Sequence, residues 1–361
     1  MAIIQQRDPA TTKTALADWL AAQLPGAHDV AIHVAGASEV SGFSSDTIIF
    51  DASWRDAGGE HRQGFVVRAA PLGEAVFETY EIGLQFRIMR AVADHSDVPV
   101  PRVLWLEENA EVLGAPFFAM ERLGGRVPAD NPPYTLGGWL LDATADQRRT
   151  AWLDGIDTLA SIATIDWKAA GLAELDRSEL GALGQQQLIA WQRRYYDFAA
   201  RHKVPCVEHA WEWLLANQPA DDHLIGFCWG DARLGNLMFG DDFRVKAVFD
   251  WEMARIGNPE FDLAWYLWFD KHFSDGIGIP RLDGFPSDAE SIARWEAQVG
   301  RRAEHLEWYT VLTMVWFAAI MMRVVQSNIA HGATPDDLLP METNNLCTQM
   351  LARHFDLEPP T

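Results

Sequence analysis

Two short stretches in the second half of the sequence carry the residues best suited to chemistry. Asp231 and Asn236 lie in Cys228-Trp229-Gly230-Asp231-Ala232-Arg233-Leu234-Gly235-Asn236, and Asp250 follows in Val248-Phe249-Asp250-Trp251-Glu252. Kinase-type phosphoryl transfer uses this order: one carboxylate faces the attacking hydroxyl, while an amide and a second carboxylate hold magnesium. Singly, each residue has an ordinary explanation, because aspartate and asparagine also form turns and helix caps. Together they predict a phosphoryl-transfer site.

A hairpin is expected to bring two of these residues together. Alternating apolar residues predict a strand that closes at Asp250, and Gly240-Asp241-Asp242 predicts the turn that folds it back. Asn236 and Asp250 would then lie at neighbouring ends of one hairpin. Amide and carboxylate oxygens are ligands that Mg²⁺ accepts, so a shared ion is geometrically reasonable.

The first third of the chain is expected to form a β-rich lobe. Helical spacing predicts helices over residues 11–24 and 78–92, the second with Ile82, Phe86 and Met89 on one face. Strands are expected over residues 31–35, 47–50, 64–69, 103–107 and 117–120. These elements predict a mostly antiparallel sheet with one long helix.

The pattern becomes helical after Leu123-Gly124-Gly125. Trp308–Met322 is short for a membrane span and predicts a buried helix. The expected fold class is α+β with two lobes, a sheet-containing lobe over residues 1–122 and a mainly helical lobe over 123–361, with a cleft between them. Further helices are expected over residues 145–165, 188–202 and 209–216, and from residue 262 onward.

Composition limits the partners. The 361-residue chain has a formal net charge of −22, whereas nucleic acids and anionic membranes favour basic patches, so neither is expected to bind. Its 3 cysteines are far apart and form no disulfide or zinc pattern. The first residues lack the basic-then-apolar layout of a signal peptide, so a cytoplasmic protein is expected. The oligomeric state stays open.

The two stretches resemble the aminoglycoside phosphotransferase/choline kinase-like family, which shares the protein-kinase fold. The resemblance is carried by Trp229-Gly230-Asp231, Asn236 and Asp250-Trp251-Glu252 and spans roughly residues 36–268. Other segments look like the branch related to the kinase domains beside acyl-CoA dehydrogenases, namely Val98-Pro99-Val100-Pro101-Arg102, Gly114-Ala115-Pro116-Phe117, Met120-Glu121-Arg122 and Ile256-Gly257-Asn258-Pro259 with Asp262-Leu263-Ala264.

The resemblance implies roles for the central residues. Asp231 would be the catalytic aspartate, with Asn236 and Asp250 as magnesium ligands and ATP as phosphoryl donor. Asp262 would brace the catalytic loop by accepting backbone N–H bonds, or could cap the helix that follows it. Trp229 replaces a frequent histidine of the family at a structural position.

The resemblance also implies a nucleotide site in the first lobe. The link whose backbone pairs with adenine would be Met120, Glu121, Arg122 and Leu123. The phosphate loop would be formed by Ser41, Gly42, Phe43, Ser44 and Ser45, although an ordinary hairpin turn explains the same residues.

Arg68 departs from the family pattern, which has lysine on this strand to hold the α- and β-phosphates. Arginine keeps the charge with another geometry, while a solvated charge at a strand end is the alternative. The helix glutamate that should pair with it falls on Gln85, and Glu81 or Glu78 could substitute. The sequence does not choose among them.

The acceptor is less well defined than the reaction. Candidate acceptor contacts are Trp191, Arg194, Tyr195 and Trp268, although most of the 16 tryptophans are expected in the core. Arg233 could neutralise developing charge or anchor the loop through an ion pair.

We expect an ATP- and Mg²⁺-dependent phosphotransferase acting on a hydroxyl of a small molecule, a hydroxyacyl-type or other apolar hydroxy compound. An aminoglycoside O-phosphotransferase is one alternative. A non-catalytic nucleotide-binding pseudokinase is another, suggested by Arg68 and Gln85.

Overall fold

The computed structural model describes residues 7–34, 46–219 and 225–360. The chain divides into two compact units, each assembled from three segments. Unit 1 comprises Met1–Arg90, Pro101–Leu123 and Val324–Thr334, and unit 2 comprises Ala91–Val100, Gly124–Arg323 and Pro335–Thr361.

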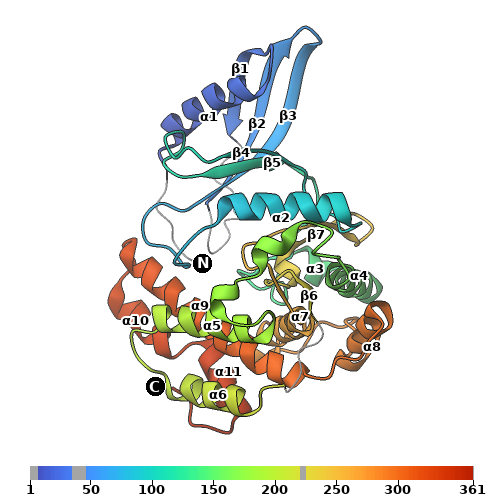
Figure 1. Cartoon of the computed structure of the whole chain (residues 1–361), viewed down its shortest axis with the longest axis vertical. Helices are drawn as coiled ribbons and strands as arrows, with labels where there is room; N and C mark the ends of the chain where they lie inside the picture. Colours follow the sequence, from blue (N-terminus) through green and yellow to red (C-terminus); the bar gives the residue numbers. More distant parts are fainter. Residues whose placement is uncertain (1–6, 35–45, 220–224, 361) are drawn as a thin grey trace. The chain divides into compact units, whose positions relative to one another are not determined.

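A five-stranded antiparallel sheet with the order β1-β2-β3-β5-β4 is the centre of unit 1 (Figure 1). Its two longest strands form a hairpin in which Asp56 pairs with Gly59, so the turn lies between these two residues. The elements are α1 (Pro9–Gln23), β1 (His28–Val34), β2 (Asp46–Asp56), β3 (Gly59–Ala69), α2 (Ile82–His95), β4 (Val103–Glu107) and β5 (Phe117–Glu121).

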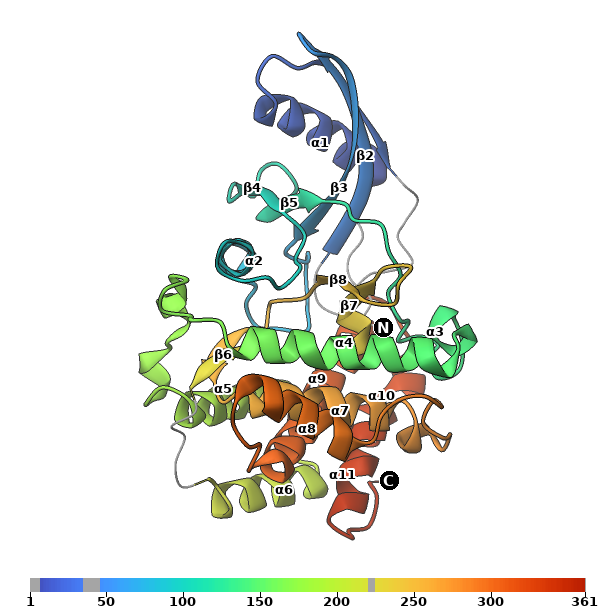
Figure 2. The same cartoon turned by 90° about the vertical axis from the view of Figure 1, so that its right-hand side faces the viewer.

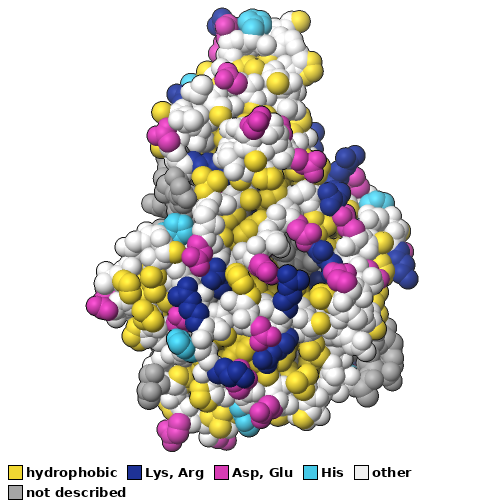
Figure 3. Space-filling model, turned by 60° about the vertical axis from the view of Figure 1, so that its left-hand side comes forward, with side chains coloured by type: hydrophobic (Ala, Val, Ile, Leu, Met, Phe, Trp, Pro, Cys, Tyr) yellow, Lys and Arg dark blue, Asp and Glu magenta, His cyan; other side chains and the backbone are white. Residues whose placement is uncertain are grey.

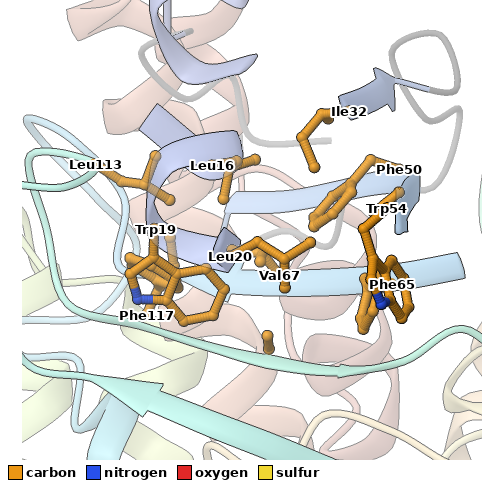
Figure 4. Close-up of a cluster of buried hydrophobic side chains, with 13 residues drawn as sticks. Leu16, Trp19, Leu20, Ile32, Phe50, Trp54, Phe65, Val67, Leu113 and Phe117 are labelled. Atoms are coloured by element: carbon orange, nitrogen blue, oxygen red, sulfur yellow. The ribbon is translucent and has the colours of Figure 1, made fainter. Parts of the chain in front are cut away.

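Apolar side chains between α1 and the sheet form the core of unit 1 (Figure 4). The ring of Trp19 meets Phe117 edge-on with centroids 4.8 Å apart, and its Nε1–H donates to Glu107 at 2.9 Å. Strand residues enter this core in alternation because successive side chains point to opposite faces. The cluster comprises Leu16, Trp19, Leu20, Ile32, Phe50, Ala52, Trp54, Phe65, Val67, Ala69, Leu113, Phe117 and Ala119.

Helix α2 packs on the other face of the sheet. Phe118 points away from the α1 core and meets Phe86 of α2 edge-on, with centroids 6.1 Å apart. The sequence predicted a helix from residue 78, but α2 begins at Ile82. In the segment before α2, Val76 is buried and the backbone N–H of Phe77 donates to the hydroxyl oxygen of Tyr80 at 3.1 Å.

Unit 2 is mainly helical, with two short two-stranded sheets, β6-β9 and β7-β8 (Figure 2). Its remaining elements are α3 (Trp139–Asp142), α4 (Ala145–Ala163), η1 (Leu172–Leu175), η2 (Ser178–Leu180), α5 (Gln185–Ala199), α6 (Pro205–Ala216), β6 (Gly226–Cys228), η3 (Leu234–Asn236), β7 (Leu237–Phe239), β8 (Val245–Val248), β9 (Arg255–Gly257), α7 (Glu260–His272), η4 (Asp275–Ile277), α8 (Asp288–Val299), α9 (Leu306–Ala330), α10 (Pro335–Thr343) and α11 (Leu346–His354).

Two of these helices are core elements. Every turn of α7 carries buried side chains, including Asp262 and Trp265. Helix α9 is long and apolar enough for a membrane span, with mean hydropathy 1.6, but 89% of that stretch is buried inside the protein. The expected buried helix over Trp308–Met322 is therefore confirmed.

Charged side chains of both signs share the protein surface. On the face drawn in Figure 3, lysine and arginine side chains are interspersed with aspartate and glutamate. Among the charged side chains of the protein, Arg149 pairs with Glu290 and Arg294 with Asp157, and both pairs are partly exposed to solvent. Exposed pairs of this kind add little to the free energy of unfolding, typically about 0–1 kcal/mol each.

Candidate active site

The loop after β6 holds Asp231 at the centre of unit 2. Gly230 enables its sharp path, because its φ is +97° and a Cβ there would lie 2.2 Å from the carbonyl oxygen of Met253. Only glycine meets both requirements at low strain. The loop then closes with the 3₁₀ turn η3, whose last residue is Asn236.

Three side chains hold the carboxylate of Asp231. Arg233 shares its Nε–H between the two oxygens at 3.0 and 3.1 Å. Trp265 of α7 donates from Nε1 to Oδ1 at 3.0 Å, and Asn236 donates from Nδ2 to Oδ2 at 2.7 Å. The carboxylate is thus fixed in orientation by groups from the loop and from α7.

The surroundings of Asp231 also set its acidity. Burial raises the pKa of Asp231 above its ordinary value, and the nearby charge of Asp250 acts in the same direction. Arg233 and the hydrogen bond from Asn236 oppose this rise. A carboxylate whose pKa is raised is a better proton acceptor than an ordinary aspartate.

Arg233 is locked between two carboxylates. Besides its contact with Asp231, its Nη1 donates to Asp130, and both partners are largely buried. Burial works to lower the pKa of Arg233, but Asp130 and Asp231 outweigh it and raise that pKa. Of the two roles that the sequence left open, an ion pair that anchors the loop is the one seen here.

Asn236 and Asp250 lie at adjoining ends of the β7–β8 hairpin, as the sequence predicted. Leu237 pairs with Val248, and the N–H of Phe249 donates to the carbonyl of Asn236 at 3.0 Å. Because Nδ2 of Asn236 is directed to Asp231, its Oδ1 is the atom left to coordinate a cation. Asp250 has φ +61°, a left-handed conformation that is uncommon for residues other than glycine and marks a constrained position.

This donor set fits Mg²⁺. The ion takes oxygen ligands and binds through one or two carboxylates together with substrate phosphates and water, so a dedicated protein cage is not needed. Among the described residues no group of three or more His, Cys, Asp or Glu side chains could hold a metal. Asn236 and Asp250 would therefore hold the ion jointly with phosphate oxygens.

Asp262 braces the loop from α7. Its two carboxylate oxygens accept the backbone N–H groups of Trp229 at 2.6 Å and Gly230 at 2.9 Å. Helix α7 begins at Glu260, so Asp262 lies inside the first turn and the alternative helix-cap role is wrong. Burial raises the pKa of Asp262 to about 6, although the two N–H bonds oppose the rise.

Trp229 connects the loop to the hairpin. Its buried indole donates from Nε1 to the carbonyl oxygens of Phe249 at 2.7 Å and Asp250 at 3.2 Å. A histidine at this position could supply one N–H in the same way. The tryptophan therefore keeps a donor beside the constrained backbone of Asp250.

The predicted nucleotide-binding residues belong to unit 1. Arg68 is the penultimate residue of β3, where it is half-buried and its Nη1 donates to Thr47 at 3.2 Å. Met120 and Glu121 are the last residues of β5. The N–H of Glu121 donates to Arg102, so within the sheet this amide is already used.

The next residue, Arg122, is also engaged within unit 1. The N–H of Arg122 donates to the carbonyl oxygen of Gly64 at 3.1 Å, and its guanidinium pairs with Asp51 at 2.7 Å. Pairing with adenine through Met120–Leu123 would therefore fall to the carbonyl groups and to Leu123, because the amides of Glu121 and Arg122 are taken.

The remaining nucleotide-site predictions concern the phosphate loop and the possible partners of Arg68. Ser41, Gly42, Phe43, Ser44 and Ser45 lie outside the described residues. Gln85 is buried on α2, and its backbone N–H donates to the carbonyl of Glu81 at 3.0 Å. Glu81 directly precedes the first helical residue and Glu78 lies outside α2, so these glutamates do not occupy earlier turns of the helix as expected.

The candidate acceptor residues fall into an aromatic region of unit 2. Trp191 and Tyr195 of α5 both contact Trp316 of α9, with ring centroids 4.7 and 6.3 Å apart. Arg194 is exposed on the same helix. Trp268 of α7 is only 2% exposed, and its Nε1 has no hydrogen-bond partner.

Two side chains that contact the catalytic-loop residues, Asp130 and Trp265, were not predicted from the sequence as part of the site. Asp130 precedes the loop by about a hundred residues and carries no motif, so no local signal identifies it. Trp265 had a signal, because it lies three residues after Asp262 and such residues share one face of a helix. The face that braces the loop therefore also orients Asp231.

A model of the phosphotransferase enzyme family matches residues 39–297 of the chain. Acyl-CoA dehydrogenase family member 11 of Homo sapiens is 28% identical over 234 residues, which is 61% of this chain and 28% of that protein. The probable acyl-CoA dehydrogenase IBR3 of Arabidopsis thaliana is 27% identical over 322 residues, which is 81% of this chain and 38% of that protein. The chain thus spans well under half the length of these relatives.

Solved structures share the fold. A protein of Ralstonia eutropha assigned as an aminoglycoside phosphotransferase has TM-score 0.69 at 23% identity, covering 96% of this chain and 98% of that one. A macrolide 2′-phosphotransferase of Brachybacterium faecium has TM-score 0.54 at 17% identity, with coverage of 92% and 98%. The α+β, protein-kinase-like fold expected from the sequence is confirmed.

Proposed function

Because the chain belongs to the phosphotransferase enzyme family, we propose that it moves the γ-phosphoryl group of ATP to a hydroxyl of a small molecule. The observation that carries the proposal is the environment of Asp231. Its carboxylate is oriented by Arg233, Asn236 and Trp265, and Asn236 and Asp250 lie side by side on the adjoining hairpin.

Asp231 would orient the acceptor hydroxyl and take its proton. The Nε–H of Arg233 is shared between both oxygens of Asp231, so a hydroxyl can take over one of these two positions without breaking the ion pair. The pKa of Asp231, raised by burial, suits the carboxylate to hold a proton as the new O–P bond forms. Phosphoryl transfer needs mainly positioning and charge neutralisation, and this loop supplies both.

Magnesium would be held by Asn236 and Asp250 and, when bound, neutralises charge on the phosphates. The protein keeps these two ligands in place by other contacts. Asn236 is oriented through its bonds to Asp231, and the indole of Trp229 fixes the carbonyl of Asp250. Support for ATP as donor comes from a neighbour of the same fold, at TM-score 0.52, whose ternary complex holds AMP-PNP and hygromycin B.

The acceptor that suits this chain is a hydroxyacyl-type or other apolar hydroxy compound. Trp265, which contacts Asp231, belongs to an aromatic cluster with Phe269 and Trp316, at centroid distances of 5.3 and 6.4 Å. The resemblance to acyl-CoA dehydrogenase relatives agrees with an acyl-type acceptor. An aminoglycoside, the substrate class named for the Ralstonia neighbour, is the alternative.

The test is ATP consumption by the purified chain over a panel of hydroxy compounds, with Asp231→Asn as the inactive variant. We expect Mg²⁺-dependent phosphorylation of an apolar hydroxy compound, lowered in Asp231→Asn by roughly 10³-fold with nucleotide binding kept. Turnover near wild type in Asp231→Asn would rule out the assigned role. Phosphorylation of kanamycin alone would favour the aminoglycoside alternative.

If the chain is a non-catalytic pseudokinase, the same phosphorylation assay should give the opposite result. If the chain only binds nucleotide, Mg·ATP raises its melting temperature but no acceptor in the panel gains phosphate. The intact set of Asp231, Asn236 and Asp250 supports the enzyme, because a binding protein has no need of an oriented base beside two metal ligands.

A further inference from the structure

Arg255 is a buried cation that forms no ion pair with a carboxylate of the described residues. It begins β9 and is only 6% exposed. Its Nε and Nη2 donate to the carbonyl oxygen of Met253 at 3.1 and 2.9 Å. Its Nη1 has no hydrogen-bond partner, and in the part of the chain that the structure describes no carboxylate pairs with it.

Two other arginines of unit 2 that lie over tryptophan rings each pair with a carboxylate. Arg281 stacks on Trp152 and pairs with Asp270, and Arg301 stacks on Trp295 and pairs with Glu260. A buried charge without a partner is strongly unfavourable, so the contrast calls for an anion at Arg255.

Aromatic rings surround this guanidinium. Its central carbon lies 4.3 Å from the ring centroid of Trp316, 4.5 Å from Trp191 and 4.8 Å from Phe261. Trp316 is itself 2% exposed, and its Nε1–H has no hydrogen-bond partner among the described residues either. Both orphaned groups can only donate, so together they favour a hydrogen-bond acceptor that carries negative charge.

The guanidinium of Arg255 is protonated at neutral pH. Burial lowers the pKa of Arg255 to about 10, although the fields of Cys228 and Asp262 oppose this change. Its guanidinium is therefore still protonated under ordinary conditions, and an anion would relieve the lost hydration.

The same aromatic cluster reaches the reactive carboxylate. Trp316 meets Trp265 edge-on with ring centroids 6.4 Å apart, and Trp265 donates to Asp231. A series of side-chain contacts thus links Arg255 to Asp231 through Trp316 and Trp265. Trp191 is the partly exposed ring of the three around Arg255, so access from solvent is on its side.

We propose that Arg255 and Trp316 bind an anionic group of the acceptor, so that the acceptor is a hydroxy acid with an apolar body. The carboxylate would lie at Arg255 and Trp316, the chain along Trp316 and Trp265, and the hydroxyl at Asp231. The identification of this ligand as the acceptor rests on the proposed phosphotransferase function. The binding of an anion at Arg255 does not.

Direct binding tests the anion subsite without catalysis. Calorimetry with the full chain would compare octanoate, octan-1-ol, octylammonium and inorganic phosphate. We expect octanoate to bind at least about tenfold more tightly than octan-1-ol, because the hydrogen bonds to charge are added to the apolar contact. Equal affinity for octanoate and octan-1-ol would overturn the proposal, as would phosphate binding as tightly as octanoate.

Matched variants locate the binding. Trp316→Phe removes the Nε1–H but keeps a ring, Arg255→Lys keeps the charge but loses the planar donors, and both should weaken octanoate about tenfold or more. Trp295→Phe is the control, because Trp295 is another buried tryptophan whose Nε1 lacks a partner and whose ring lies under an arginine. Equal octanoate affinity in all three variants contradicts the subsite. If Arg255→Lys does not fold, Trp316→Phe decides.

Turnover separates this proposal from the proposed function. Hydroxyoctanoates with the hydroxyl at successive carbons would be offered with Mg·ATP, and KM for the active isomer should rise in Trp316→Phe while KM for ATP stays unchanged. Octanoate binding that depends on Arg255, without phosphorylation of any isomer, leaves the subsite standing and counts against the proposed function. Phosphorylation that is indifferent to both substitutions leaves the function standing and overturns the subsite.

Discussion

The indole nitrogen of Trp265 donates a hydrogen bond of 3.0 Å to Oδ1 of Asp231. Trp265 lies one helical turn beyond Asp262, whose carboxylate accepts the N–H groups of Trp229 and Gly230. One face of α7 therefore fixes both the backbone of the loop and the carboxylate that the loop presents.

Replacing Trp265 by phenylalanine should lower kcat about tenfold, because Asp231 loses one of the bonds that orient it. KM for ATP should not change. Trp211→Phe is the matched control, since Trp211 is buried and its Nε1 has no partner. Steady-state kinetics of the two variants decide the matter, and equal kcat values would show that the bond is irrelevant to turnover.

Asp130→Asn should destabilise the protein and reduce activity together. The substitution leaves Arg233 buried with a single carboxylate, and breaking a largely buried ion pair costs roughly 3 kcal/mol. Asp157→Asn, which removes the more exposed pair with Arg294, should change the free energy of unfolding by about 1 kcal/mol or less. Urea unfolding measures both, and equal losses would contradict the buried role of Asp130.

Two substitutions at Asp250 separate its backbone from its carboxylate. Glycine accepts φ +61° without strain, so Asp250→Gly should be more stable than Asp250→Ala by about 1 kcal/mol. Both variants should lose stabilisation by Mg·ATP, because both lack the carboxylate. Thermal melts with and without Mg·ATP give the two quantities. Retained stabilisation by Mg·ATP would remove Asp250 from the metal site, and an alanine variant as stable as the glycine one would remove the strain argument.

Asp262 should make both stability and activity depend on pH below neutrality. Its pKa is about 6 in the folded chain, against 3.8 for an ordinary aspartate, so the folded state binds more protons between these values. The free energy of unfolding should therefore fall as pH rises from about 4 to about 6 through this residue, and level off above.

Activity should change in the opposite direction. A protonated Asp262 directs an O–H at an amide N–H that it previously bound, so kcat should drop as pH falls below about 6.

Denaturant titrations of Asp262→Asn and of wild type at several pH values measure how the free energy of unfolding changes with pH. The variant should lack the change that we assign to Asp262. A slope that persists unchanged in the variant would assign it to another group.

The sequence predicted the local geometry of the hairpin better than the packing around it. The order of Asp231, Asn236 and Asp250 and the turn between the last two were sufficient to expect the hairpin, because strand alternation and turn residues are local signals. The partner of Arg233 was not predictable, since Asp130 is distant in the chain and long-range ion pairs leave no periodic trace.

Helix ends were the weakest part of the fold prediction. The 3.6-residue pattern of Ile82, Phe86 and Met89 located α2 correctly but could not show that Val76 is buried outside it. Arg255 shows the same limit for sites, because a single arginine after an apolar segment reveals neither its burial nor the rings around it. Such features depend on tertiary packing.

The division of unit 1 into three segments has a consequence for synthesis. Its last segment, Val324–Thr334, returns to the unit late in the chain, where Ser327 Oγ donates to the carbonyl of Glu74 at 3.4 Å. The sheet can pair as soon as residue 121 emerges, but the unit is incomplete until residue 334 of 361 has left the ribosome. Long-range closure of this kind slows folding, so the nascent chain carries an unfinished unit 1 from the synthesis of β5 until the end of α9 has emerged.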